Sequence, residues 1–461
     1  TYIRYGMHQL HEPDHQPYSL LIGKEPLMPL LYAIFGTLSG DYLVGARIVT
    51  VLFGALTLLG LYLFIKKITD KRVALVAGLL YVFAPYTLFF DRLALLDSGV
   101  STIVVWSLYF SYKLFQNSRW LDAFSLGVVT GLGLWIKTST LFYILLPILS
   151  YGALYLFDNA AEEKKISKIK MFGTALVLAL LIFLPLFSNA LYPEHMKLLQ
   201  QYTYPFFSVF SFPLGVWWKN LSDVTSWVFF YLTPPLCLLA VGSIILFWKK
   251  KEMWLVSIWL LVPLVYEILY AKLFTSRHAL LLVIPLLIFA AFGWYHLLRK
   301  NKAIAYSFVG LILLWSSVYN FRLLTDPQTY PSLYAGPARV DLEPYVYGFS
   351  SGYGVLDAIV YLQQQSTQQH IVVLVRNDHG NPEDAVIGYL IYNPNISVVP
   401  IHDATQLPQV FSQIDTSVPV YFVSRGAYYA GMEKYFANQK KFLKPSDTEF
   451  VGVELLTQRP H

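Results

Sequence analysis

The sequence predicts a polytopic, all-α membrane domain followed by a small extracytoplasmic α/β domain. Apolar runs recur between residues 42 and 321, and only 13% of the 461 residues are charged, against about 25% in an ordinary soluble domain. Runs of 18 or more residues are long enough to cross a hydrocarbon core of about 30 Å as a helix. After residue 321, short helical and β-rich runs alternate, which is typical of an α/β domain. We therefore expect a first extracytoplasmic loop with interfacial helices over 1–41, a transmembrane domain over 42–321 and an α/β domain over 322–461.

About ten spanning helices are expected from the apolar runs. They cover 42–65, 73–91, 98–115, 121–135, 139–157, 171–191, 225–248, 252–270, 278–298 and 303–321. The loops between them alternate in positive charge, with clusters such as 66–72 and 164–170 on one side and few cations on the other. Because cytoplasmic loops carry the excess of Lys and Arg, the clustered side is cytoplasmic. The net charge of +6 therefore reflects topology anchors, and no nucleic-acid partner is expected.

Two extracytoplasmic segments follow from this orientation. The loop over 192–224 is rich in Tyr, Phe, Trp and Pro, a composition that suits the membrane–water interface. In the tail, helices are expected over 352–365 and 381–392, and strands over 370–376, 396–401 and 418–424. The tail has no glycine-rich phosphate loop, so a nucleotide site there has little support.

Three charges lie together in the loop between the second and third runs. Asp91, Arg92 and Asp97 stand at an apolar helix end, where charges are costly and are therefore functional candidates. An Arg and a carboxylate at this spacing can hold an anionic donor and orient an acceptor or a base. The alternative is an ion pair between two helix ends, with Asp97 as the N-cap of the following run.

Other charged residues also interrupt or adjoin apolar runs. Lys24 and Glu25 precede a Pro-started apolar helix, where a cation and free N–H groups can bind a phosphate; they can equally be ordinary interface charges. Lys137 lies outside, against the positive-inside trend, and can bind an anion or reach toward lipid headgroups. Arg277, followed by His278, opens an apolar run where the helix dipole opposes a cation unless an anion is near.

A metal site has weaker support in this sequence. His8, His11 and His15, with Glu12 and Asp14, would share one face of a helix, but Pro13 and Pro17 interrupt that helix, which favours a solvated loop. Cys237 is the single cysteine, so the chain cannot form an internal disulfide. No cofactor is assigned, and binding of a divalent cation stays open.

Four segments resemble motifs of the GT-C superfamily of glycosyltransferases, which use polyprenyl-phosphate sugars. Within it they are similar to the branch of protein O-mannosyltransferases (glycosyltransferase family 39) and aminoarabinose transferases. Gly23-Lys24-Glu25-Pro26-Leu27 resembles G-[KH]-P-P-L with Glu25 for the first Pro, and Arg92 to Asp97 resembles R-x-x-x-x-D. The segment from Gly133 to Thr138 resembles G-x-x-x-x-[ST]-K, but here the hydroxyl residue follows the Lys instead of preceding it. Arg277 to Pro285 is similar to R-Y-x-x-x-x-x-P with His278 for Tyr.

The resemblance also implies a catalytic base. In this family an Asp, usually in Asp-Glu, ends the first span and is followed within a few residues by a Tyr. Thr1-Tyr2-Ile3-Arg4-Tyr5-Gly6 resembles the continuation of that motif, which makes Tyr2 and Arg4 further candidates. The base and one more span are therefore expected upstream of Thr1.

The implied activity is inverting transfer of a sugar from a polyprenyl-phosphate donor to a protein, lipid or glycan acceptor at the outer leaflet of the plasma membrane. Lys24, Arg92, Lys137 and Arg277 would bind the donor phosphate, and Asp97 would position the acceptor or a cation. Two alternatives stay open: a transporter or flippase, for which Glu267 is the main intramembrane acid, and a sensor or scaffold whose tail binds an external partner.

Overall fold

The computed structural model describes residues 1–155, 162–247, 250–330, 340–348, 350–426, 431–446 and 448–458. The chain forms two compact units. The helical unit comprises Tyr2 and His8–Ala338, and the sheet unit comprises Thr1, Ile3–Met7 and Arg339–His461. The first helix, α1 (Tyr2–His11), therefore contributes residues to both units.

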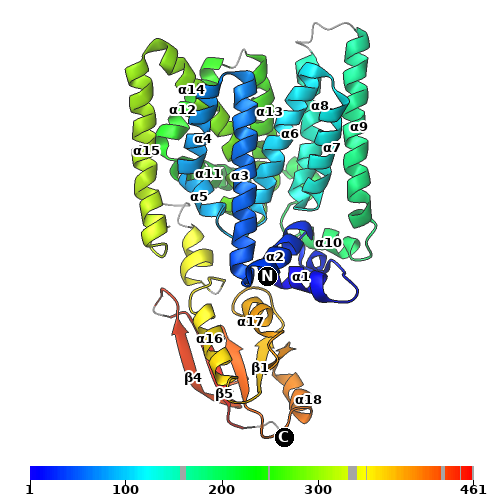
Figure 1. Ribbon diagram of the computed structural model, residues 1–461, viewed down its shortest axis with the longest axis vertical. Coiled ribbons are helices and arrows are strands. Elements are labelled where there is room, and N and C mark those ends of the chain that lie inside the picture. The colour runs from blue at the N-terminus through cyan, green and yellow to red at the C-terminus, as the bar shows by residue number, and fades with distance from the viewer. Residues whose placement is uncertain are drawn as a thin grey trace. The chain divides into compact units, whose positions relative to one another are not determined.

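The helical unit is a bundle of long helices with shorter helices at one end (Figure 1). After α1 its elements are η1 (Tyr18–Ile22), α2 (Leu27–Ser39), α3 (Tyr42–Ile68), α4 (Lys71–Phe83), α5 (Pro85–Phe90), α6 (Asp97–Asn117), α7 (Trp120–Leu134), η2 (Thr138–Leu141), α8 (Phe142–Tyr155), α9 (Glu162–Phe187), α10 (Tyr192–Leu199), η3 (Phe206–Ser211), α11 (Leu214–Tyr231), α12 (Pro234–Phe247), α13 (Lys251–Tyr270), η4 (Ser276–Leu282), α14 (Val283–Lys300) and α15 (Lys302–Thr325).

The chain is a multi-pass membrane protein, as expected. Among the described residues, six helices are long and apolar enough to cross a membrane, or seven if α11 and α12, bent by 115° at their junction, form one broken span. About ten spans were expected from the sequence. The difference arises partly where prolines begin a new helix, because proline cannot continue the backbone hydrogen bonding of the preceding turn. Pro85 thus divides the run 73–91 into α4 and α5, and Pro234 separates α12 from α11.

Burial differs strongly between the spans. Within the most apolar window, 83% of the residues of the span Ser276–Lys300 are buried, against 28% for Lys164–Phe187 and for Lys302–Thr325. The last two correspond to α9 and α15, which lie at opposite edges of the bundle in Figure 1. Their exposed leucines and valines form apolar surfaces too extensive for water but suited to lipid, which is as apolar as Leu.

Side-chain hydrogen bonds to backbone fix α6 against α3. The Thr102 hydroxyl donates to the Phe53 carbonyl (2.8 Å), and the Trp106 indole N–H donates to the Leu56 carbonyl (3.0 Å). Polar bonds of this kind join helices in lipid, where apolar contact alone gives little preference. They hold α6, and therefore Asp97 at its first position, in a defined place.

The sheet unit is an α/β domain with helices on both faces of a five-stranded sheet. Its elements are the π-helical turn η7 (Glu343–Tyr347), α16 (Val355–Gln365), β1 (Ile371–Arg376), α17 (Glu383–Leu390), β2 (Ile396–Ile401), η8 (Ala404–Gln406), α18 (Leu407–Ser412), β3 (Val420–Ser424), β4 (Phe436–Leu443) and β5 (Phe450–Leu456). The strand order is β2-β1-β3-β5-β4. The pairs β1–β2 and β1–β3 are parallel, and β3–β5 and β4–β5 are antiparallel.

Alternate residues of β1 face the two layers of helices. Val373 and Val375 pack in the core with α16 and α17, whereas Val372 and Leu374 pack in the core with α18. The expected helices and the first three strands form within two or three residues of their predicted bounds. The sequence did not reveal β4 and β5. In β4 this is understandable, because Lys440 and Lys441 break the apolar alternation, as lysines on edge strands often do.

Candidate functional site

A pocket of about 480 Å³ lies within the helical unit. Eight residues singled out from the sequence line it, although they come from distant segments: Tyr2, Lys24, Glu25, Asp97, Lys137, Glu267, Arg277 and His278. The remaining lining is largely apolar and aromatic, with hydroxyl groups from Thr138, Ser139 and Thr203. A mostly apolar cavity with a few convergent polar groups is the usual form of a ligand site.

The segment that carries Lys24 and Glu25 is fixed at both ends. The short helix η1 ends at Gly23, whose φ of 70° lies in the left-handed region, which glycine adopts without steric cost. On the other side, the backbone N–H of Leu27 donates to the carbonyl of Trp135 (3.0 Å). This bond ties the start of α2 to the end of α7, and so brings Lys24 and Glu25 beside Lys137.

Glu25 is buried and is satisfied by two groups. The Thr138 hydroxyl donates to its carboxylate, and the His195 Nε2 atom lies 3.3 Å from Glu25 Oε1. Burial acts to raise the pKa of Glu25, but the contacts with His195 and Thr138 outweigh it and hold the pKa below its ordinary value. The three side chains, of which Glu25 and His195 are buried, form a polar network that anchors one wall of the pocket.

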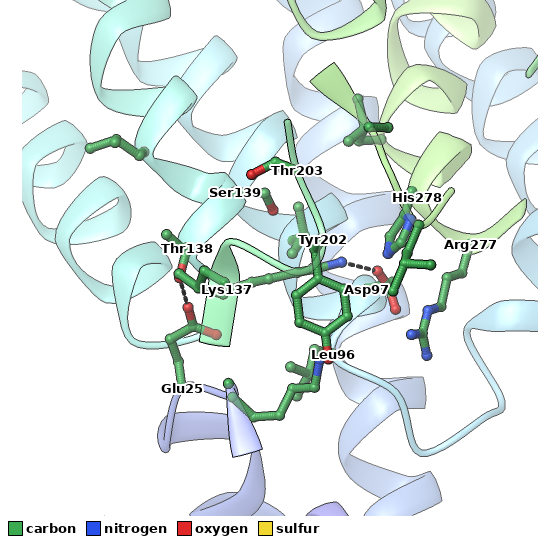
Figure 2. A pocket seen from close by; sticks show the side chains of 18 of the residues that line it. Glu25, Leu96, Asp97, Lys137, Thr138, Ser139, Tyr202, Thr203, Arg277 and His278 are labelled. Carbon is green, nitrogen blue, oxygen red and sulfur yellow. Dashed lines mark hydrogen bonds and ion pairs between the residues drawn. The ribbon is translucent and has the colours of Figure 1, made fainter. Parts of the chain in front are cut away.

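Lys137 and Asp97 form an ion pair at the pocket, with 2.7 Å between Lys137 Nζ and Asp97 Oδ1. Lys137 lies in the break between α7 and η2 with extended backbone (φ −164°), and its side chain reaches toward Asp97 and the side of the pocket that holds Arg277 and His278 (Figure 2). Burial would raise the pKa of Asp97, but the positive charges of Lys137 and Arg277 lower it to about 2. Asp97 is therefore ionised at neutral pH.

Arg277 and His278 occupy the first turn of η4, which packs against α6. Thr275 and His278 cap this turn reciprocally, and the backbone N–H of Thr275 donates to His278 Nδ1 (3.4 Å). The Tyr86 hydroxyl donates to the carbonyl of the preceding Ser276. The local backbone is thus fixed where Arg277 meets the pocket, so a cation is held at a helix start, where an anion would stabilise it.

Lys24 has a different kind of partner. Its Nζ atom lies 4.7 Å from the ring centroid of Tyr202, within the range of a cation–π contact. Among the described residues no acidic side chain pairs with Lys24. A ligand anion could therefore be neutralised by Lys24 without displacing an existing ion pair.

Three sequence candidates do not line the pocket. Asp91 accepts hydrogen bonds from Tyr81 (2.5 Å) and Ser98 (2.8 Å), so it closes the loop over 91–98. Burial raises the pKa of Asp91 to about 6. Arg92 lies in this loop, away from the pocket lining. Arg4 binds Asp384 of the sheet unit (3.1 Å between Nη1 and Oδ1). Tyr2 lines the pocket whereas Arg4 does not, because residues two apart on a helix point in different directions.

The structure also bears on the alternative N-cap role of Asp97 and on the histidine segment. Leu96, not Asp97, is the N-cap of α6, so Asp97 is available for Lys137. Helix α1 ends at His11, so His15 does not continue the face of His8 and His11. Within the described ranges, no group of three or more His, Cys, Asp or Glu side chains is placed to hold a metal ion.

Sequence reasoning missed several residues of the site, notably His195, Tyr202 and Thr203. They lie in the aromatic segment over 192–224, which reads as an interfacial loop. A signal for His195 was available in principle, because a buried carboxylate such as Glu25 requires a partner. The sequence alone, however, does not show which distant residue supplies it.

Comparisons with known proteins agree with this architecture. A family model described as dolichyl-phosphate-mannose-protein mannosyltransferase matches residues 23–188, less than half of the chain. This range contains Lys24, Asp97 and Lys137 but not Arg277. No curated protein is matched by the sequence.

Solved structures of two kinds share the fold. ArnT from Cupriavidus metallidurans matches in the apo state with a TM-score of 0.60, 13% identity and coverage of 98% of this chain and 92% of that chain. Its complex with undecaprenyl phosphate matches with a TM-score of 0.54, 16% identity and coverage of 94% and 88%.

An apo oligosaccharyltransferase from Archaeoglobus fulgidus matches with a TM-score of 0.52 and 12% identity, covering 92% of this chain. The chain spans 65% of the length of that enzyme. The family match and the shared fold confirm the resemblance to the GT-C superfamily that the sequence motifs indicated.

Proposed function

We propose that the chain is an inverting glycosyltransferase that moves a sugar from a polyprenyl-phosphate donor to a hydroxyl-bearing protein, lipid or glycan acceptor. The observation that carries this proposal is the convergence of Lys24, Lys137 and Arg277 on one pocket. These cations come from three segments that are far apart in sequence. Basic side chains gathered around a partly apolar cavity fit a ligand that combines a phosphate with a lipid chain.

The charge arrangement suits the departure of a lipid phosphate. In the proposed step, an acceptor oxygen forms a bond to the anomeric carbon while the bond from that carbon to the phosphate oxygen breaks. Negative charge then develops on the phosphate, and the acceptor proton passes to a base. Lys24, Lys137 and Arg277 stabilise the developing charge without reorganisation, because the loops that carry them are fixed in advance.

Asp97 is better suited to positioning than to proton transfer. A general base works best with a pKa near the operating pH, whereas the pKa of Asp97 is about 2. Its ion pair with Lys137 orients that cation toward the cavity. Tyr2 also lines the pocket.

The proposed reaction takes place on the extracytoplasmic side of the membrane. The positive-inside pattern of the loops supports this orientation, since the loops at 91–97 and 192–224 lie opposite the basic clusters. The pocket charges come from loops and helix ends rather than from positions along a path through the bundle. This arrangement favours a site at one face over a passage for transport.

The proposal is tested by reconstituting the full-length protein in proteoliposomes with labelled polyprenyl-phosphate sugars and a panel of hydroxyl-bearing acceptors. We expect label to move to an acceptor with inversion at the anomeric carbon. The variant Arg277→Ala should lose most of this transfer, while Lys197→Ala, which changes an exposed cation of α10, should retain it. Absence of transfer together with absence of binding to any of the donors would contradict the proposal.

A further inference from the structure

The pocket contains a third carboxylate, that of Glu267, in the last turn of α13. The other two acids of the lining are engaged: Glu25 by His195 and Thr138, and Asp97 by Lys137. Within the described part of the chain, no hydrogen bond or ion pair is recorded for the Glu267 carboxylate. This carboxylate is therefore open to a ligand in the cavity.

The position of Glu267 is energetically unfavourable for an acid. It belongs to one of the helices long and apolar enough to span the membrane, where ionisable side chains are costly and usually functional. It also lies at the C-terminal end of α13, where the helix dipole is unfavourable to a negative charge. An acid in such a place, with no partner among the residues that the structure describes, indicates a role in binding.

The end of α13 that carries Glu267 is held in place by polar contacts. The buried Asn220 side chain donates to the backbone carbonyls of Ile268 (3.2 Å) and Ala271 (2.9 Å). The segment around Thr203 pairs with Ala271 as an antiparallel bridge, and the Tyr204 N–H donates to the Tyr270 carbonyl (2.8 Å). Glu267 therefore faces the cavity from a wall whose backbone is fixed before any ligand binds.

The surroundings of Glu267 suit a polyhydroxylated ligand. Thr203 and Ser139 supply hydroxyl groups to the same cavity, and Tyr266, Phe142 and Tyr202 supply aromatic rings. Tyr266 and Phe142 contact each other with 4.2 Å between ring centroids. Aromatic rings provide apolar faces for the C–H groups of a sugar, while a carboxylate and hydroxyls satisfy its polar edge. Lys137 and Asp97 are the charged groups that act electrostatically on Glu267.

We propose that the Glu267 carboxylate is the hydroxyl-binding group of the pocket. It accepts hydrogen bonds from a substrate hydroxyl while Lys24, Lys137 and Arg277 hold the phosphate. The hydroxyl can belong to the sugar of the donor or to the acceptor, and the same carboxylate chemistry serves both. This inference rests on the proposed glycosyl transfer and adds to it the group that distinguishes a substrate hydroxyl from bare lipid phosphate.

The test compares two lipids with the full-length protein in nanodiscs: polyprenyl phosphate without sugar and the polyprenyl-phosphate sugar that supports transfer. In Glu267→Ala, affinity for the sugar-loaded donor should fall about 10- to 100-fold, as expected for a lost hydrogen bond to a charged group. Affinity for the bare lipid phosphate should be unchanged or higher, because a negative charge has been removed. A merely structural role would weaken both. Glu267→Gln, which keeps the side-chain shape, guards against misfolding of the alanine variant.

Measuring KM for the acceptor separates the two sources of the hydroxyl. If the acceptor KM rises 10-fold or more while donor affinity is unchanged, the carboxylate binds the acceptor, and the inference also stands. Glu252→Gln at the opposite end of α13 is the matched control and should change neither quantity. If the wild type binds donor and transfers sugar, and Glu267→Ala does both equally well, this inference alone would be overturned. Failure of the wild type to bind either lipid would overturn the proposed function and this inference with it.

Discussion

Each unit contains a cluster of partly buried opposite charges, and the two clusters differ in what their charged groups contact. In the helical unit, Lys24, Lys137 and Arg277 line a cavity together with Glu25 and Asp97. In the sheet unit, a second cluster follows the C-terminal ends of β1 and β3. There Arg425 binds Glu383, with 2.7 Å between Nε and Oε1, and Arg4 binds Asp384.

The difference lies in what the charges face. In the sheet unit each of these cations is bound to a carboxylate, and Arg425 also donates to the His379 carbonyl (2.7 Å), so the cluster holds loops together. In the pocket, Lys24 has an aromatic partner and no acidic one among the described residues. Charged residues in a motif therefore indicate a binding site only when they line a cavity and are not already neutralised by other side chains. Arg4 shows this, because it belongs to the same motif as Tyr2 and contributes to the structural cluster.

The largest expected effect comes from Lys137→Ala, which removes a proposed phosphate-binding cation and the partner of Asp97. Transfer should fall about 100- to 1,000-fold, the range for loss of one preorganised group that stabilises transition-state charge. Initial rates in proteoliposomes measure it, with exposed Lys197→Ala as control. A rate within threefold of the wild type would show that the pocket pair is structural, like the pairs of the sheet unit.

In the sheet unit, Arg425→Ala should act on stability instead. It leaves the Glu383 carboxylate buried without its cation, which lowers the free energy of unfolding by about 3 kcal/mol. Hydrogen exchange on the full chain should show lost protection in β1 and β3, with unchanged affinity for polyprenyl phosphate. Arg376→Ala, which changes a more exposed and more distant pair, should have little effect. Weaker lipid-phosphate binding without lost protection would show that this cluster is a binding site. The two clusters would then not differ in role.

A smaller effect is expected from Lys24→Ala. Affinity for polyprenyl phosphate should fall about 10-fold, as for one charge-assisted contact, while thermal stability should hardly change because no ion pair is broken. Lys219→Ala, which removes an exposed cation, is the control. If Lys24→Ala destabilised the protein without affecting lipid binding, Lys24 would be part of the structural framework.

The smallest effect concerns pH and Glu25. Its folded pKa lies below the ordinary value of 4.5, so its ionised form stabilises the folded state above that pH, and this contribution is lost as pH falls through the folded pKa. Thermal unfolding of the wild type and of Glu25→Gln should therefore differ most near neutral pH and converge on acidification. A difference that grows toward low pH would contradict the assignment of the His195–Glu25 pair.

Much of this organisation follows from local sequence. Run length predicts the spans, alternation predicts β1, β2 and β3, and the cost of charge beside apolar runs predicts Lys24, Lys137 and Arg277 as candidates. Other features depend on contacts that no local pattern encodes. The bond between Leu27 and Trp135 joins two motifs, and the bridge between Thr203 and Ala271 brings an aromatic loop beside Glu267. The same limit explains Arg92 and Asp91, whose loop is folded back by Tyr81 and Ser98.

The central claim is that Lys24, Lys137 and Arg277 form a binding site for a lipid phosphate. The most direct test is the affinity of the full-length protein in nanodiscs for polyprenyl phosphate that carries no sugar. We expect saturable binding that weakens at least 100-fold when the three cations are replaced together by alanine, with a helical content that is unchanged. Equal affinity of the wild type and this triple variant would contradict the claim.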